Sequence, residues 1–241
     1  MTASRLTWLF DLDNTLHDAS HAAFGPTNQA MTDYIARHLG LSQSDASTLR
    51  AHYWRRYGAT LLGLVRHHGV KASNFLEETH RLPGLESRLR TSAHDRAALQ
   101  RLPGRKFVLT NAPRAYTVRV LDTLRLSDCF DGIVCIEDMT MFGHHRPKPD
   151  ARMLRHVAAR LGVRPERCVL IEDTLDHQRS ARRIGMKTVW MQRYVRGAIH
   201  AGTDSLKVGV HHCLKPGYVC ARIKRIQPLR SLWCTRDELH S

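Results

Sequence analysis

The stretch Leu6-Thr-Trp-Leu-Phe-Asp11-Leu-Asp13-Asn-Thr15-Leu16 decides the fold of this chain. It begins with an apolar run, which is typical of a short buried strand. The run ends at Asp11 and Asp13, whose spacing of two places both side chains on one side of an extended chain. Two carboxylates this close repel each other unless a cation or a shared proton offsets them. We expect a divalent ion such as Mg²⁺, which prefers oxygen ligands. The alternative is an ordinary loop whose aspartates cap the next helix.

The chain after residue 104 alternates between apolar strands and helical segments. Strands are predicted over 105–110, 132–136, 167–172 and 187–191, with helices over about 113–125, 150–161 and 177–184. This rhythm favours an α/β fold with a doubly wound, Rossmann-like parallel sheet, where ligands bind beyond the carboxyl ends of the strands. The polar residues of interest follow strands or stand in the loops after them, and they are Asp11, Asp13, Thr110, Asn111, Lys148, Glu172 and Asp173.

Residues 19–103 differ from the rest because they show no strand-like alternation. Helices are predicted over 20–39, from Leu41 to Tyr57, and over about 59–68 and 72–80, with Gly40 and Gly58 ending the first two. We therefore predict a helical cap domain over 19–103, inserted into a core domain made of 1–18 and 104–241. Such a cap would stand over the strand ends that hold the carboxylates.

Composition narrows the class of protein. The chain has 241 residues, 42% of them hydrophobic, as expected for a globular protein. No apolar run approaches the length needed to span a membrane, and the N-terminus does not resemble a signal peptide. Six cysteines without a CxxC pair favour a reduced, cytoplasmic protein. The net charge of +15 is spread along the chain, which favours a solvated basic surface over specific nucleic-acid binding.

The last part of the chain, 193–241, is basic and carries no recognisable chemistry. A further strand is predicted over 218–223, and a short final helix carries Ile226, Leu229 and Leu232. The segment 197–216 between them is expected to be a loop. No oligomeric state is indicated by the sequence.

The four motifs together resemble the signature of the haloacid dehalogenase-like phosphohydrolase superfamily. They are Asp11-x-Asp13-x-Thr15, Thr110-Asn111, Lys148 within Arg-Pro-Lys-Pro-Asp, and Glu172-Asp173, and the resemblance extends to about residue 192. It implies that Asp11 is the nucleophile and forms an aspartyl-phosphate, while Asp13 acts as acid and then base. It further implies that Mg²⁺ is held by Asp11, Asp173 and a backbone carbonyl at Asp13. Whether Glu172 or Asp176 joins these ligands is left open.

The resemblance also assigns the groups that hold the phosphoryl oxygens. Lys148 and the Thr110 hydroxyl would hold them together with amides around Leu12 and Asn14, and Asn111 belongs to the same motif. For Thr110 and Asn111, capping of the following helix is the competing interpretation, although a helix N-terminus is itself a place where anions bind. Lys148 between prolines is alternatively a plain surface turn.

Within the superfamily the chain looks like the pyrimidine 5'-nucleotidase group. The similar stretches are 10–16, Tyr53-Trp-Arg-Arg-Tyr57-Gly-Ala-Thr60 to Leu64, 80–83, 102–112 and 172–174. The resemblance implies release of phosphate from nucleotides such as UMP or CMP. Tyr53, Tyr57 and Thr60 of the cap are candidate substrate contacts, since Tyr53 and Tyr57 lie one helical turn apart. Packing within the cap is the competing interpretation for these tyrosines.

Three functions are compatible with these residues. The first is a Mg²⁺-dependent nucleotidase acting on a small phosphate ester. The second shares that chemistry but acts on another ester, such as a sugar phosphate or phosphoglycolate. The third is a basic binding protein that keeps the fold without turnover, against which the complete set of motif residues argues.

Overall fold

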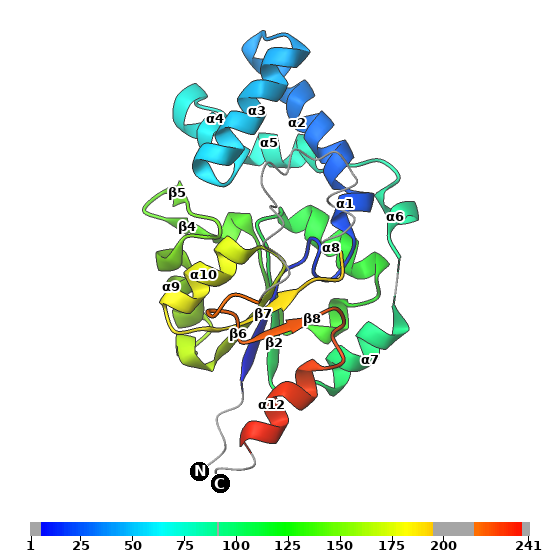
Figure 1. Ribbon diagram of the computed structural model, residues 1–241. Helices are drawn as coiled ribbons and strands as arrows, with labels where there is room; N and C mark the ends of the chain where they lie inside the picture. The colour runs from blue at the N-terminus through cyan, green and yellow to red at the C-terminus, as the bar shows by residue number, and fades with distance from the viewer. Residues whose placement is uncertain (1–5, 91, 195–214, 238–241) are drawn as a thin grey trace.

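The computed structural model describes residues 6–90, 92–194 and 215–237. Its core is a parallel sheet of six strands in the order β3-β2-β1-β6-β7-β8 (Figure 1). The strands are β1 (Thr7–Phe10), β2 (Arg105–Leu109), β3 (Gly132–Val134), β6 (Cys168–Glu172), β7 (Lys187–Met191) and β8 (Ala221–Ile223). This arrangement confirms the predicted doubly wound α/β class.

Strand β1 lies in the middle of the sheet because both of its faces are apolar. Trp8 and Phe10 enter the hydrophobic cluster on one face, whereas Leu9 enters the cluster on the other, as the two-residue period of a strand requires. Helices α8 (Arg114–Thr123) and α12 (Leu229–Asp237) contribute to the first cluster, and α9 (Ala151–Arg160) and α10 (Leu175–Arg183) to the second. Both faces of the sheet are therefore covered, and its carboxyl edge is left to hold polar side chains.

Helices stand above that edge in Figure 1 and form the expected cap. They are α1 (Ala19–Ala22), α2 (Phe24–Leu39), α3 (Gln43–Tyr57), α4 (Thr60–His68) and α5 (Ala72–Thr79). Gly40 and Gly58 end α2 and α3 in the left-handed conformation, which glycine adopts without strain, as the sequence predicts. Helices α2 to α5 share their own hydrophobic cluster, which Ile136 of the core joins. The cap is thus packed internally and also rests on the core.

The end of the segment expected to be cap packs differently. Helices α6 (Leu85–Arg88) and α7 (Ala93–Arg101) place Leu85 and Leu99 in the cluster that covers the sheet, together with Trp8. A helical pattern gives the period of a helix but does not name the partner that it covers. The proposed domain boundary at residue 103 remains a prediction.

The remaining elements are short. They are the 3₁₀ turns η1 (Ser127–Cys129), η2 (Ile136–Asp138) and η3 (Pro165–Arg167), and a hairpin of β4 (Thr140–Met141) and β5 (His144–His145). Strand β8 and helix α12 lie where the sequence predicts a last strand and helix. The expected loop over 197–216 falls almost wholly outside the described residues. Among the helices described, none is both long and apolar enough to cross a bilayer.

Candidate active site

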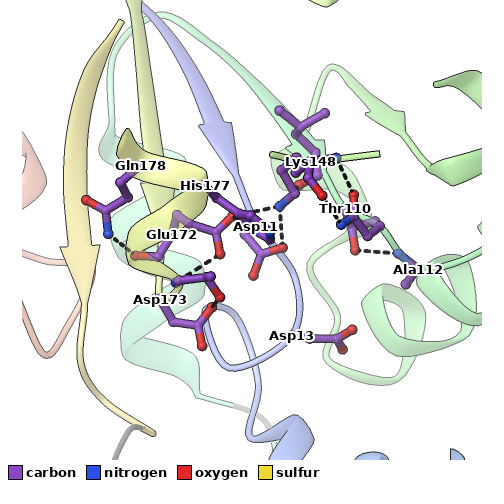
Figure 2. A network of polar contacts seen from close by, with 12 residues as sticks. Asp11, Asp13, Thr110, Ala112, Lys148, Glu172, Asp173, His177 and Gln178 are labelled. Atoms are coloured by element: carbon purple, nitrogen blue, oxygen red, sulfur yellow. Dashed lines mark hydrogen bonds and ion pairs between the residues drawn. The ribbon is translucent and has the colours of Figure 1, made fainter. Parts of the chain in front are cut away.

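Polar side chains from three neighbouring strands meet at the carboxyl edge of the sheet (Figure 2). Asp11 follows β1, Thr110 follows β2, and Glu172 and Asp173 stand at the end of β6. Since β1 pairs with both β2 and β6 in parallel, their carboxyl ends lie side by side. The sequence prediction that these residues converge is therefore met by the geometry.

Lys148 supplies the positive charge at the centre of this group. Its Nζ donates to Asp11 Oδ1 at 2.7 Å, to Glu172 Oε2 at 2.7 Å and to the carbonyl of Leu109 at 2.8 Å. These bonds use all three ammonium protons. With a relative exposure of 1%, Lys148 is not the residue of a plain surface turn.

Asn111 holds the loop that presents this lysine. Its side-chain carbonyl accepts from the Lys148 amide at 2.9 Å, and its side-chain amide donates to the Lys148 carbonyl at 2.9 Å. The loop then leads into α9, where Asp150 caps the helix by accepting from the amides of Arg152 and Met153. Asn111, expected to bind phosphate, thus has a defined role in fixing Lys148, and direct contact with phosphate stays a prediction.

Burial and crowding set the charges of the three carboxyl groups. Burial, reinforced by Glu172 and only partly opposed by Lys148, raises the pKa of Asp11 to about 7. Burial and the charge of Glu172 raise the pKa of Asp173 well above its usual range. Burial acts to raise the pKa of Glu172 as well, but Lys148 and His177 together hold it below its usual range. Three carboxyl groups therefore share one lysine, and Asp11 and Asp173 hold protons more readily than isolated carboxyl groups do.

The same three carboxyl groups fit a divalent cation. Asp11, Glu172 and Asp173 each offer an oxygen, and these oxygens lie within 4.8 Å of one another. Hard cations such as Mg²⁺ select carboxylate oxygens, and a cation would offset the repulsion that raises the pKa of Asp11 and Asp173. One of these oxygens belongs to Glu172, and coordination of a cation by Glu172 stays a prediction. Asp176, the other candidate, has a side chain that is 71% exposed and pairs with Arg179.

Asp13 lies apart from these carboxylates. Its Oδ1 accepts from the Tyr116 hydroxyl at 2.8 Å and lies 2.9 Å from His17 Nε2. A ligand role for its backbone carbonyl stays a prediction. Tyr116 and His17 were missed by the sequence analysis. The spacing of four between Asp13 and His17 is a weak signal, and Tyr116 has none, because only the fold brings α8 to this position.

The other expected phosphate-binding residues shape the loop between Asp11 and α1. Leu12 is fully buried, and its carbonyl accepts from the amide of Leu16 at 2.9 Å. Asn14 has a φ of 58°, and its side chain accepts from the Ser20 amide at 3.0 Å. Thr110 is buried, and its Oγ1 accepts from the amide of Ala112 at 3.0 Å, so its hydroxyl proton is left for another acceptor. Phosphate binding by these groups stays a prediction.

Comparison with known proteins decides the family. The family model for haloacid dehalogenase-like hydrolases matches residues 7–185. The chain belongs to this family. Within it, the chain is similar to phosphate metabolism protein 8 of Saccharomyces cerevisiae, with 25% identity over 196 residues, which cover 76% of this chain and 60% of that protein. The chain thus spans under two thirds of this curated relative.

Solved structures of other haloacid dehalogenase-like proteins share the fold. A HAD phosphatase from Thermococcus onnurineus matches with a TM-score of 0.59 and 20% identity, over 94% of this chain and 97% of that one. A 2-haloacid dehalogenase from Pseudomonas syringae matches with a TM-score of 0.57 and 19% identity, over 96% of this chain and 99% of that one. Because both kinds of hydrolase match equally well, the choice between them depends on the site.

The cap of this haloacid dehalogenase-like hydrolase holds two of its three candidate substrate residues inside its own packing. Tyr53 is 7% exposed, and its ring lies so close to Gly63 that a Cβ there would be 2.2 Å away. The buried Thr60 donates to the carbonyl of Arg50 at 3.2 Å. These placements favour the packing interpretation, and substrate contact by either residue stays a prediction.

Tyr57 stands at the end of α3, where the cap approaches the core. It is partly buried, and its hydroxyl lies 2.6 Å from His67 Nε2. Gly58, the next residue, faces Pro149, since a Cβ added to it would be 3.7 Å from the proline Cδ. The turn between α3 and α4 is therefore a part of the cap that reaches the loop of Lys148.

Proposed function

We propose that this hydrolase is a Mg²⁺-dependent phosphatase that releases phosphate from nucleoside 5'-monophosphates, with a preference for pyrimidine nucleotides. The observation that carries the proposal is the contact of 2.7 Å between the buried Asp11 carboxylate and Lys148, beside Glu172 and Asp173. A nucleophile, a fixed positive charge and a set of cation ligands are what phosphoryl transfer requires. The proposal rests on this geometry and on the motif resemblance together.

Asp13 supports a phosphatase rather than a dehalogenase. A poor leaving group such as an alkoxide needs a proton as its bond to phosphorus breaks, and a carboxyl group two residues after the nucleophile can give one. Displacement of a halide needs no such acid. Asp13 keeps a partly exposed carboxyl group, with 23% of its side chain accessible, so it is available to a substrate beside Asp11.

The reaction would proceed in two steps. An oxygen of Asp11 forms a bond to phosphorus while the ester P–O bond breaks, and the leaving oxygen takes the proton of Asp13. Water then attacks the aspartyl-phosphate and passes a proton to Asp13, which releases phosphate and restores Asp11. Lys148 neutralises charge on Asp11 and on the phosphoryl oxygens. A Mg²⁺ ion held by Asp11, Asp173 and Glu172 would keep Asp11 ionised and polarise the phosphoryl group.

The nucleotide preference rests on the resemblance of the cap stretch from Tyr53 to Leu64 to that of pyrimidine 5'-nucleotidases. In this proposal the strand-end residues would contact only the phosphate and the cation, so they would not distinguish one ester from another. The end of α3 and its turn into α4 are suited to do so because they lie against Pro149. The name of the yeast relative, phosphate metabolism protein 8, agrees with phosphate chemistry but specifies no substrate.

The test is a turnover assay on a panel of phosphate esters with and without Mg²⁺. The panel holds UMP, CMP, a purine nucleotide, a sugar phosphate, phosphoglycolate and p-nitrophenyl phosphate, and free phosphate is measured. We expect Mg²⁺-dependent release with the highest kcat/KM for UMP or CMP, and none from Asp11→Asn, because an amide is a poor nucleophile and ligand. Preference for the sugar phosphate or phosphoglycolate would contradict the nucleotide assignment. If no ester of the panel were hydrolysed, the protein would be a binding protein without turnover. If Asp11→Asn were active, the covalent mechanism would be wrong.

A further inference from the structure

Asp13 is held by two side chains that both contact the same one of its carboxyl oxygens. The Tyr116 hydroxyl donates to Oδ1 at 2.8 Å, and His17 Nε2 lies 2.9 Å from that oxygen. Tyr116 and His17 also approach each other, with 3.2 Å between the hydroxyl oxygen and Nε2. Figure 2 shows the Asp13 carboxyl group set apart from the group formed by Asp11, Lys148 and Glu172.

The hydrogen atoms can be assigned from the partners of each group. The Tyr116 hydroxyl has one proton and gives it to Asp13. His17 Nδ1 is buried and has no partner among the described residues, which fits a neutral ring with its proton on Nε2, because a buried N–H without an acceptor is costly. Both groups then donate to Asp13 Oδ1. An oxygen that accepts two such bonds is a poor place for a proton, so the acidic proton belongs on Oδ2.

The two donors are rigidly placed. Tyr116 and His17 are each 2% exposed, and Tyr116 lies in the first turns of α8. The edge of the His80 ring packs against Tyr116 with 5.7 Å between ring centroids and 67° between planes. The carbonyl of Leu76 at 3.1 Å and Thr79 in turn fix His80, so residues from the end of α5 support the tyrosine from the cap side. Residues of the core contact Asp13 directly, and residues at the end of the cap helix α5 support Tyr116 from the other side.

We propose that Tyr116 and His17 are positioning residues that hold Asp13 Oδ1, so that Oδ2 carries the proton given to the leaving group. The inference rests on the proposed phosphatase function. In the first step, the Oδ2 proton moves to the ester oxygen as its bond to phosphorus breaks, and the negative charge left on Asp13 is stabilised at Oδ1 by the two donors. In the second step, a proton from the attacking water returns to Oδ2. This role requires no contact of Tyr116 or His17 with the substrate.

The test compares esters whose leaving groups need protonation to different degrees, namely p-nitrophenyl phosphate and phenyl phosphate. Tyr116→Phe removes the hydroxyl and keeps the ring against His80. We expect kcat/KM for phenyl phosphate, which reports the first step alone, to fall about tenfold, while kcat/KM for p-nitrophenyl phosphate changes by about twofold or less. His17→Leu, which removes the second donor, should give the same selective loss.

Two comparisons separate positioning from a structural role. Tyr34→Phe is a matched control, because Tyr34 is a buried tyrosine of the cap with 3% exposure, and it should alter neither ester. In an Asp13→Asn background, which lacks the transferable proton, adding Tyr116→Phe should cause no further ester-dependent loss. An equal loss of kcat/KM on both esters, a selective loss that persists in the Asp13→Asn background, or no loss of kcat/KM would overturn the inference. A wild-type protein that hydrolyses neither these esters nor UMP or CMP would instead overturn the proposed function, and this inference with it.

Discussion

Lys148 Nζ lies 2.7 Å from Asp11 Oδ1 although 137 positions separate the two residues in the chain. Both side chains are buried, so the pair is shielded from water and from salt. The same ammonium group also contacts Glu172, which makes one lysine the shared partner of two carboxylates. We therefore expect the stability of the site and its chemistry to depend on this one side chain, and this dependence can be measured.

Replacement of Lys148 by methionine should cost both activity and stability. Two buried carboxylates would lose their cation, and breaking a buried pair in this way costs about 3–5 kcal/mol of the free energy of unfolding. The loss should be largest near pH 8 and smaller near pH 5, because in the variant no lysine lowers the pKa of Asp11 and Glu172, and their protonation at low pH removes the uncompensated charge. Urea unfolding at the two pH values measures it.

The control for Lys148 is Arg81→Met. Arg81 pairs with Glu77 at 3.0 Å, but both side chains are about two thirds exposed, so the pair should contribute about 0.5 kcal/mol or less. If Lys148→Met were no more destabilising than Arg81→Met, the shared pairing would not have the energetic role assigned to it.

The cation ligands can be tested without an activity assay. Mg²⁺ should raise the melting temperature of the wild-type protein, because an ion that binds only the folded state stabilises it. Asp173→Asn should abolish that increase. Asp176→Asn, three residues further along in the first turn of α10, should retain it, since the Asp176 side chain is 71% exposed and lies outside the carboxylate group. A chelator should end turnover, and Mg²⁺ should restore it. Turnover that survives thorough chelation would contradict a cation site.

His80 should make the fold less stable as the pH falls. Burial lowers the pKa of His80 from 6.5 to about 4, so the folded protein keeps this ring neutral. Between these values the unfolded chain binds a proton that the folded protein does not. The contribution of the buried neutral His80 ring to stability is therefore fully present above pH 6.5. As the pH falls towards 4, the free energy of unfolding decreases by on the order of 3 kcal/mol.

This prediction is checked by measuring the free energy of unfolding of the wild type and of His80→Gln at several pH values from 7 to 4. The difference between the two proteins should shift in favour of the variant as the pH falls. His94→Gln, at an exposed position of α7, controls for the loss of a histidine as such. A constant difference between the wild type and His80→Gln would contradict the prediction.

Substrate preference should depend on Tyr57 more than on Tyr53. Tyr57→Ala should lower kcat/KM for UMP or CMP roughly ten- to a hundredfold more than for p-nitrophenyl phosphate, if the ring stacks on the base. Tyr53→Ala should lower the melting temperature and affect all substrates alike, because the ring fills space above Gly63 inside the cap. Uniform loss and destabilisation in Tyr57→Ala as well would assign Tyr57 to cap packing.

The central part of the fold could be predicted from local sequence because each strand is a short apolar run that ends at polar residues. The run from Trp8 to Phe10 is apolar on both faces, and only a sheet covered on both sides buries it completely. The packing of α7 could not be predicted in this way. Leu99 has the same helical spacing whether it faces the cap or the sheet, and only the tertiary structure places it in the same cluster as Trp8.

The residues of the candidate site likewise include some that the sequence predicts and some that only the tertiary structure reveals. Asp11, Thr110 and Asp173 could be predicted because parallel strands bring their ends together. The contacts of Asn111 with the Lys148 backbone and of Tyr116 with Asp13 could not, because each joins a side chain to a loop or helix whose path depends on the whole fold. For the tyrosines of the cap, the sequence does not decide between packing and binding, because the helical spacing of Tyr53 and Tyr57 is the same for both.

The position of β1 in the sheet has a consequence for biosynthesis. Thr7 pairs with Arg105 on one side and with Cys168 on the other, so both partners of the first strand are made long after it. Contacts between distant residues form slowly because a long loop must close first. While the chain is being translated, the cap helices are completed before β1 has any neighbour. Its apolar residues then remain partly exposed to other chains and to chaperones until residues 168–172 have left the ribosome, and only then can Asp11 come together with Glu172 and Asp173.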